Sequence, residues 1–214
     1  MKYPILILLL AIFSLPSGAQ DLMSVFLSVP DDVLFGIDAE GKDKLIANPA
    51  DTAVVSVPST LNGEVKRLQI SDDYIQLQTS GAATLQIKLL PLVNDSKIIC
   101  VVNTVCGKAC DSYVRFYNTN WTPLSNPGML LPNPGKDWFL KTGIDRSDEE
   151  YINAHAALDM IPTKVILYPG NQALTLQCDI KNYLSVGDYK KIEPYIQNLS
   201  KNYGWDKISF KPES

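Results

Sequence analysis

The chain has 214 residues, a formal net charge of −4 at pH 7 and 46% hydrophobic residues. This length suits one domain, or two small ones, with a buried core. The acidic balance and the lack of dense Lys/Arg clusters argue against nucleic acid and anionic membrane surfaces as partners.

The beginning of the chain, residues 1–20, has the pattern of a signal peptide. A basic residue precedes the apolar run 5–13, and small residues follow it, as in secretory leaders. We expect cleavage after Ala19 or Gln20. The first cysteine is Cys100, so a bacterial lipid anchor is not expected. No later run has the roughly 20 apolar residues of a membrane-spanning helix, and the sequence predicts a periplasmic or secreted protein without a membrane span.

After the leader, the hydrophobic period changes to two near residue 54. Residues 22–48 predict short helices interrupted by glycine and proline. Segments 65–70, 74–79 and 83–90 then alternate apolar and polar residues, with turn residues between them. This alternation predicts an antiparallel meander with one buried face and one solvated face.

The most distinctive stretch, residues 96–117, predicts two strands joined by a tight loop at 107–109. This loop would place Cys106 opposite Cys110, Thr104 opposite Ser112, Val102 opposite Val114, and Cys100 opposite Phe116, all on one face. The first strand is apolar on both sides. It therefore has the character of a central strand.

The remainder of the chain begins with a Pro-rich segment, 121–136, which contains four prolines and two glycines. Further elements are predicted after it: a helix over 147–159 opened by a capping box, a hairpin of 164–168 with 173–180, a helix over 185–199 broken at Pro194, and a strand over 207–211.

Together these elements predict an α+β fold: an antiparallel meander sheet with helices packed on one face, plus a C-terminal hairpin-and-helix portion. We expect a single domain over residues 21–214. It divides naturally into two subdomains, 21–125 and 137–214, joined by the Pro-rich strap 121–136.

Four cysteines follow the predicted leader. In an oxidising compartment, four cysteines indicate two disulfides more often than a metal site. Cys106 and Cys110 are expected to pair across the hairpin, because they flank its loop. We expect the second bridge between Cys100 and Cys178, since both fall on inward faces. The alternative is that these two are buried free thiols.

Four segments of the chain resemble one family of exported proteins from Bacteroides-type bacteria, the domain of unknown function 3256. They are LLPLVNDSKIICVVNTVCGKACDSYVRFYNTNWTPL at 89–124, FLSVPDDVL and DDYIQLQTSGAATLQIKLLPL before it, and DYKKIEPYI near the end. The resemblance implies a periplasmic or surface location and a shared α+β fold. It implies no activity.

Common catalytic motifs are poorly supported. A serine or cysteine hydrolase needs a histidine base, and the only histidine, His155, is predicted mid-helix on an apolar stripe. Cys106 and Cys110 lack thioredoxin-type spacing, although a thiol–disulfide protein is a further alternative. No metal site and no cofactor are expected. Carboxylates that remain candidates for a hydrolase of envelope or dietary polymers lie at 31–32, 72–73 and 145–150.

For this protein's function, a binding surface is favoured over catalysis. We expect six side chains on the outer face of the sheet: Tyr74, Gln76, Gln78, Tyr113, Arg115 and Tyr117. Aromatic, amide and guanidinium groups together suit recognition of a protein or a glycan; the alternative is an ordinary solvated β face. The sequence thus favours a non-catalytic binding or envelope-accessory module that uses this face or the Pro-rich strap, with an envelope protein or glycan as partner. It gives no indication of oligomeric state.

Overall fold

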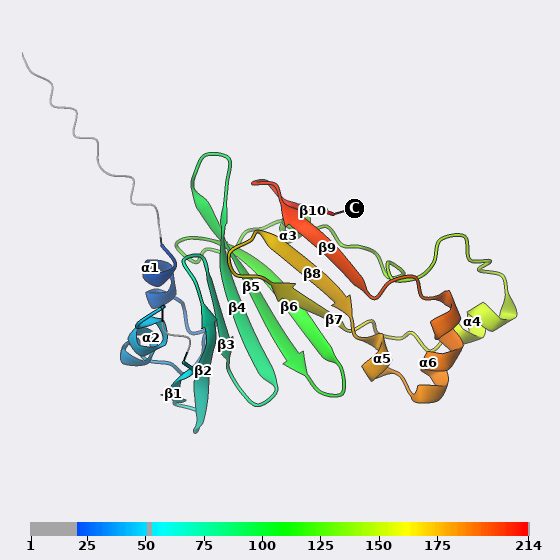
Figure 1. Ribbon diagram of the computed structural model, residues 1–214, viewed down its shortest axis with the longest axis horizontal. Coiled ribbons are helices and arrows are strands. Elements are labelled where there is room, and N and C mark those ends of the chain that lie inside the picture. Colours follow the sequence, from blue (N-terminus) through cyan, green and yellow to red (C-terminus); the bar gives the residue numbers. More distant parts are fainter. Residues whose placement is uncertain (1–20, 51–52, 214) are drawn as a thin grey trace, which may run out of the picture.

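The computed structural model describes residues 21–50 and 53–213, so the predicted signal peptide lies outside the described residues. The helices are α1 (Leu22–Leu27), α2 (Ala39–Ile46), α3 (Pro127–Leu130), α4 (Glu149–His155), α5 (Ile180–Tyr183), α6 (Val186–Ile192) and the 3₁₀ helix η1 (Glu193–Tyr195) (Figure 1). The strands are β1 (Val55–Ser59), β2 (Gly63–Ile70), β3 (Tyr74–Gln78), β4 (Ala83–Pro91), β5 (Lys97–Cys106), β6 (Cys110–Asn118), β7 (Thr163–Leu167), β8 (Ala173–Cys178), β9 (Ser200–Trp205) and β10 (Phe210–Pro212). The predicted α+β class is confirmed.

The first six strands form one antiparallel sheet in the order β1-β2-β3-β4-β5-β6. Each strand pairs with the next one along the chain, as expected of a meander. The central hairpin has the predicted register, with Cys106 opposite Cys110, Thr104 opposite Ser112, Val102 opposite Val114 and Cys100 opposite Phe116. The alternation of side chains, together with the three-residue loop, was therefore sufficient to predict this pairing.

One face of the six-stranded sheet is covered by α1 and α2 (Figure 1). The side chains of Asp21 and Asp38 cap the two helices by accepting hydrogen bonds from backbone N–H groups of the first turn, which stabilises such short helices. Beyond β6, the Trp121 indole N–H donates to the Val25 carbonyl at 3.0 Å. The apolar layer between helices and sheet includes Phe26, Leu34, Leu45, Val57, Ile75, Leu77, Leu85, Ile87, Ile99 and Val101.

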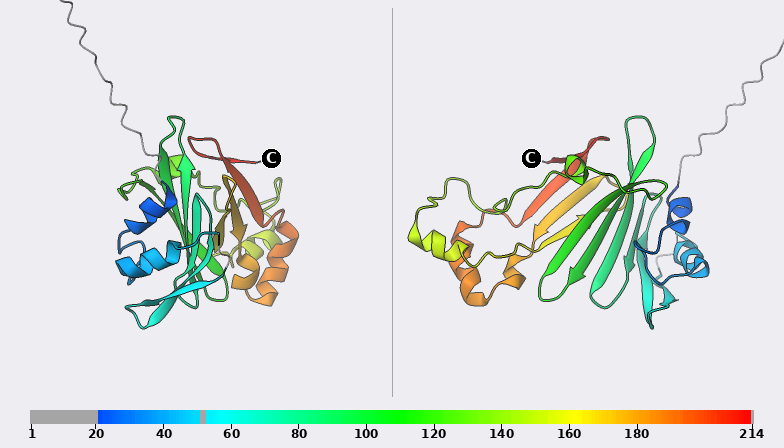
Figure 2. Two further views of the ribbon diagram at one scale, coloured as in Figure 1. Left: turned by 60° about the vertical axis from the view of Figure 1, so that its left-hand side comes forward. Right: turned by 180° about the vertical axis from the view of Figure 1, so that it is seen from behind.

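The opposite face of the same sheet is covered by a second antiparallel sheet, in the order β10-β9-β8-β7. Figures 1 and 2 show the resulting three layers: helices, six-stranded sheet and four-stranded sheet. The apolar residues between the two sheets include Tyr74, Cys100, Val102, Phe116, Val165, Leu174, Tyr203, Trp205 and Phe210. The central strands β4 and β5 are therefore buried on both sides over most of their length.

This arrangement contradicts the prediction that one face of the meander is solvated. Gln86 is 4% exposed and Lys88 is fully buried, although both have the polar character of solvated positions. The reason is that the alternating polar side chains have partners in the second sheet. Burial of polar groups is tolerated where each is hydrogen-bonded.

Those partners include backbone groups along the free edge of β7 and at Tyr168, the residue that follows it. The amide of Gln86 donates to the Val165 carbonyl at 3.1 Å and accepts from the Leu167 N–H at 2.9 Å. Lys88 Nζ contacts the Tyr168 carbonyl at 2.9 Å and the Asp73 carboxylate at 2.8 Å. Side chains of the first sheet thus satisfy an edge strand of the second, where a neighbouring strand would otherwise pair.

A helical portion lies at one end of the second sheet, formed by α4, α5 and α6 (Figure 1). Its core includes Phe139, Leu140, Tyr151, Cys178, Ile180 and Ile192. Two predictions were wrong in extent. The helix predicted over 185–199 ends at Ile192 before the turn containing Pro194, and the chain then forms β9. The N-cap of α4 is Asp148, so the predicted capping box beginning at Ser147 is not formed, and the helix ends at His155, before the predicted end at 159.

The cysteines were half correctly predicted. Cys106 and Cys110 form a disulfide, with Cα atoms 4.0 Å apart. Cys100 and Cys178 are buried free thiols rather than a second bridge. The first packs between the two sheets and the second in the helical core, so their inward orientation leads them into different clusters.

The predicted subdomains 21–125 and 137–214 share a core, because the cluster between the sheets takes residues from both. The strap segment also contributes to it, through Leu124, Leu130 and Leu131. Within the described residues, no helix combines the length and apolar character needed to cross a membrane.

Candidate functional site

The predicted outer face is not one surface. Tyr74 pairs with Lys88, Lys88 with Cys100, and Cys100 with Phe116. Residues in lateral register share a face, so Tyr74, Gln76 and Gln78 point toward the second sheet. Tyr113, Arg115 and Tyr117 point to the opposite face, the face of α1 and α2. The six residues are therefore divided between the two sides of the sheet, because their positions differ by one in register.

Both tyrosines at the ends of this set are buried. Tyr74 is 1% exposed and its hydroxyl donates to Gln86 Oε1 at 3.1 Å; burial raises the pKa of this phenol. Tyr117 is 2% exposed and packs edge-on against Trp121. Of the predicted exposed aromatic and cationic groups, only Tyr113 and Arg115 remain. Tyr113 is 64% exposed, and the Arg115 guanidinium lies over its ring.

A hollow of about 450 Å³ lies on the α1/α2 side of the sheet. Its lining includes Asn103, the register partner of Tyr113, and the exposed side chains of Phe35 and Leu61. The remaining part of the predicted face thus borders a concave surface. Recognition by Tyr113 and Arg115 stays a hypothesis for this side of the molecule.

Another depression lies on the other side of β6, against the Pro-rich strap. This strap groove has a volume of about 360 Å³. One wall is formed by the end of the strap, from Leu131 to Lys136, and by Trp138, which follows it. The other wall comes from β6, β7, β8 and the turn at 158–161. Its apolar lining consists of Leu131, Pro132, Pro134, Trp138, Leu158, Ile161, Val165 and Leu176.

The sequence holds the strap beside β6 by contacts at both of its ends. The Leu124 N–H donates to the Phe116 carbonyl at 2.9 Å, which fixes the beginning of the strap on β6. At the other end, the Phe139 carbonyl accepts from the Gln197 N–H, and Leu140 forms a bridge with Ile196. Between these points three prolines and Gly135 limit regular structure to the single turn of α3, so the strap lines the groove as a largely irregular segment.

Some polar groups around the strap groove already have partners. Ser112 Oγ lies 2.8 Å from Thr104 Oγ1 and accepts from the Val165 N–H. Asp159 accepts from the Tyr183 hydroxyl at 3.0 Å. These contacts fix the side of the groove formed by the two sheets.

Two donors in the lining are unengaged. Within residues 21–50 and 53–213, neither the Lys136 ammonium nor the Trp138 indole N–H makes a hydrogen bond or an ion pair. Trp138 is half-buried with its ring edge-on to Phe139. An apolar hollow with a partly exposed tryptophan and a free cation at its rim has the composition of a recognition site.

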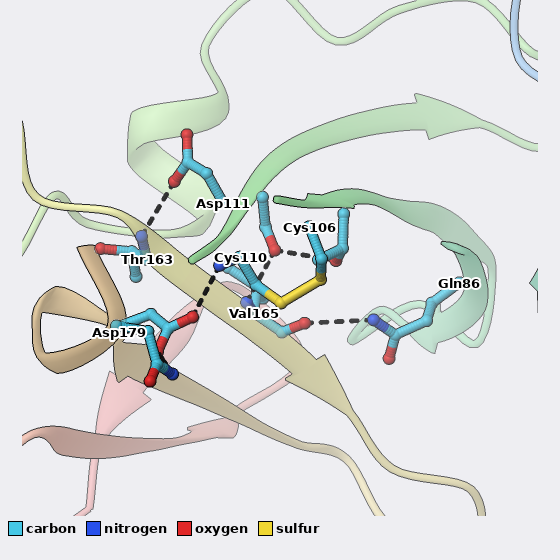
Figure 3. Close-up of a disulfide and its surroundings, with 10 residues drawn as sticks. Gln86, Cys106, Cys110, Asp111, Thr163, Val165 and Asp179 are labelled. Carbon is cyan, nitrogen blue, oxygen red and sulfur yellow. Dashed lines mark hydrogen bonds between the residues drawn. A yellow bond between two sulfur atoms is a disulfide. The ribbon is translucent and has the colours of Figure 1, made fainter. Parts of the chain in front are cut away.

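The hairpin disulfide, Cys106–Cys110, lies at the end of β6 where the two sheets meet (Figure 3). The Cys110 N–H donates to Asp179 Oδ2 at 2.6 Å, and the Thr163 N–H donates to Asp111 Oδ1 at 2.9 Å. Each carboxylate therefore accepts from the backbone of the other sheet. The geometry indicates a structural role for this corner.

Other candidate catalytic groups have local structural partners. His155 Nε2 lies 3.1 Å from Asp137 Oδ1, and Arg146 lies 3.1 Å from the other oxygen of that carboxylate. Asp145 accepts from Ser147, which lowers the pKa of Asp145. In the described part of the chain, no group of three or more His, Cys, Asp or Glu side chains is placed to hold a metal ion.

A family model described as "Protein of unknown function (DUF3256)" matches residues 14–210. The chain belongs to this family. The DUF3256 chain is also similar to a solved structure titled "Structure of a domain of an uncharacterized protein from Porphyromonas gingivalis W83". The TM-score is 0.79 with 25% sequence identity, and the match covers 88% of this chain and 97% of that chain. No curated protein matches significantly.

Sequence reasoning for this DUF3256 chain missed the lining that comes after the strap. Trp138, Leu158 and Ile161 lie in three separate segments by sequence, and only the fold brings them together. The available signal was the density of apolar residues among the strap prolines, which would not be expected to face water.

Proposed function

We propose that this protein is a non-catalytic binding module of the cell envelope, which holds an apolar group of a protein partner in the strap groove. The observation that carries the proposal is the unengaged Trp138 indole N–H and Lys136 ammonium beside an apolar hollow of about 360 Å³. Tryptophan is prominent among residues that dominate binding energy at protein interfaces. A partner with an apolar anchor and an acidic neighbour fits this chemistry.

The carboxylates favour binding over hydrolysis. Asp159 is the one carboxylate in the groove lining, and it is held by Tyr183, whereas a glycosidase uses two. Across the described residues, each aspartate whose carboxyl pKa departs from its ordinary range has it lowered, by hydrogen bonds to neighbouring N–H and hydroxyl groups: Asp21, Asp145, Asp188 and Asp206. A general acid needs the opposite shift.

An envelope location is part of the proposal. It rests on the leader pattern over residues 1–20 and on the disulfide, since disulfides persist in oxidising compartments. Expression of the full chain in a Gram-negative host, followed by mass spectrometry of the periplasmic product, tests it. We expect a new N-terminus at Gln20 or Asp21; an uncleaved cytoplasmic product would contradict export.

The binding proposal is tested with the exported protein and a phage-displayed library of random 12-residue peptides. Peptides selected on the wild type are synthesised, and their affinities are measured by fluorescence anisotropy. Trp138→Ala is expected to weaken binding at least 30-fold, as for a central aromatic anchor. Lys136→Glu is expected to lower the affinity for peptides with acidic residues only about fivefold, since the cation at the groove rim is exposed.

The matched control is Lys108→Glu, the same charge reversal at an exposed position on the loop of the central hairpin, outside the groove lining. It is expected to leave affinity within a factor of two. Thermal melting of each variant shows whether it is folded. Selected peptides that bind a folded Trp138→Ala variant as tightly as the wild type would remove the strap groove as the binding site.

A further inference from the structure

β6 is an edge strand of the six-stranded sheet. Backbone groups on its free edge form hydrogen bonds at three positions. The Cys110 N–H donates to Asp179, the Phe116 carbonyl accepts from Leu124, and the Asn118 N–H donates to the Thr122 carbonyl. Because backbone groups alternate in direction along a strand, the even-numbered residues of β6 direct their N–H and C=O groups to this edge.

Two residues between those positions have no such partner. Ser112 and Val114 direct their backbone N–H and C=O groups to the same edge, and within the described residues none of these four groups takes part in a hydrogen bond. An edge strand with open backbone groups is a template for another strand. Here the template is three residues long, from Ser112 to Val114.

The open edge adjoins the strap groove. Ser112 is itself part of the groove lining, with Leu131, Trp138 and Ile161 among the residues around it. In a strand added to β6, residues beside Ser112 and Val114 would direct their side chains to the face that these two share, which is the face of the groove. The alternate residues would lie on the face of Tyr113 and Arg115.

The charges near the open edge specify the partner further. Arg115 makes no ion pair with a described residue, and its Nε is buried without a hydrogen-bond partner. Lys136 is also unpaired at the groove rim. A segment with acidic side chains next to its apolar anchor would supply both cations with partners.

The occupant must also be narrow. Asp179 and the segment 122–124 occupy the neighbouring backbone groups on either side of Ser112–Val114. A strand embedded in the sheet of a second folded copy would meet these flanking segments. An isolated chain can pair over these three residues and turn away from the edge on either side.

We propose that the partner is a short extended polypeptide segment that pairs as a strand with β6 at Ser112–Val114, with an apolar side chain in the strap groove and an acidic side chain near Arg115. This inference rests on the proposed function and specifies its ligand. Backbone pairing supplies affinity, and the groove selects side chains at alternate positions.

The first test acts on the peptide, so protein folding does not affect it. The tightest 12-residue peptide from the display selection is synthesised with a single N-methyl group at each position in turn. N-methylation removes one N–H donor. Affinity is expected to fall about tenfold at alternate positions across the paired region and to change little at the positions between them. An N-methyl scan without this period of two would overturn strand pairing.

The second test acts on β6. Val114→Pro removes an N–H that has no partner in the fold, at an edge position where proline is tolerated. The substitution is expected to lower the affinity for the peptide about tenfold. The control is Val186→Pro, which places proline at the exposed first residue of α6, a position that also accepts it and that is not part of the groove lining.

The outcomes separate the two proposals. Suppose that Trp138→Ala loses peptide binding, while a folded Val114→Pro variant binds the peptide as tightly as Val186→Pro. This result would support groove binding and overturn strand pairing. Binding unaffected by Trp138→Ala would overturn both. A wild-type dimer in sedimentation equilibrium that Val114→Pro converts to a monomer would assign the edge to a second copy and overturn the peptide proposal.

Discussion

Gln86 gives the sharpest test of how the two sheets are joined. It is 4% exposed and makes three hydrogen bonds: to the Val165 carbonyl, from the Leu167 N–H and from the Tyr74 hydroxyl. Gln86→Leu keeps the approximate volume but removes all three. The Val165 and Leu167 backbone groups would remain buried at the free edge of β7 without a partner.

The loss of stability follows from the buried backbone groups that Gln86→Leu leaves without a hydrogen-bond partner. Leaving a buried donor or acceptor unsatisfied costs about 1–3 kcal/mol, and the added apolar character of leucine returns about 1 kcal/mol. Relaxation of the Tyr74 hydroxyl reduces the sum further. We expect the free energy of unfolding to fall by about 3 kcal/mol, which corresponds to a melting temperature lower by about 6–12 °C for a chain of this size.

The measurement is urea denaturation of the oxidised protein followed by circular dichroism, with thermal melting in parallel. Gln76→Leu is the control, because Gln76 lies beside Gln86 in register on the same face and its side chain makes no hydrogen bond within the described residues. It is expected to change stability by less than about 0.5 kcal/mol. Equal effects of the two substitutions would refute the idea that Gln86 docks the second sheet.

Three further predictions concern buried charge and sulfur. Asp73→Asn leaves the fully buried Lys88 ammonium without its counter-ion. Since Asp73 is partly exposed, we expect urea denaturation to show a free energy of unfolding lower by about 2 kcal/mol. The control Asp72→Asn, at the exposed neighbouring residue, is expected to cause no loss. Replacing both cysteines of the hairpin disulfide by serine is expected to cost about 2 kcal/mol, because the closed loop is short; a cost above about 4 kcal/mol would contradict a local staple. Burial raises the pKa of the Cys100 thiol, and raises that of Cys178 to about 11. Neither thiol should therefore react with Ellman's reagent at pH 8 in the native protein, whereas two should react after denaturation, and none if the two were bridged.

Sequence patterns were most successful where one local rule decided the structure. The loop between Cys106 and Cys110 fixes the register of β5 and β6, because a three-residue turn allows few alternatives. The same alternation could not show what covers each face. Gln86 and Lys88 have the side chains of solvated positions, yet β7 lies over them, and β7 comes about 80 residues later in the chain.

The candidate site was predictable only in part, for a related reason. The strap was identifiable from its prolines, but the groove needs Trp138, Ile161 and Ser112 in one place, which is a property of tertiary packing. The expected binding face failed because Gln76 lies in lateral register with Val114, one residue from Tyr113, and a single step reverses the direction of a side chain. Cys100 and Cys178 likewise both point inward, but into separate cores.

The junction between the two sheets differs in kind from the pairing within them. Backbone ladders survive most substitutions, because every residue type except proline carries the same donor and acceptor. The contacts of Gln86 and Ser112 with β7, and of Lys88 with Tyr168 just after it, are made by side chains. Point mutations can therefore change them one bond at a time while both sheets persist. Family members should therefore differ more in the angle between their sheets than in the sheets themselves. Since the strap groove takes walls from both, divergence at this junction would alter ligand preference without any change in topology.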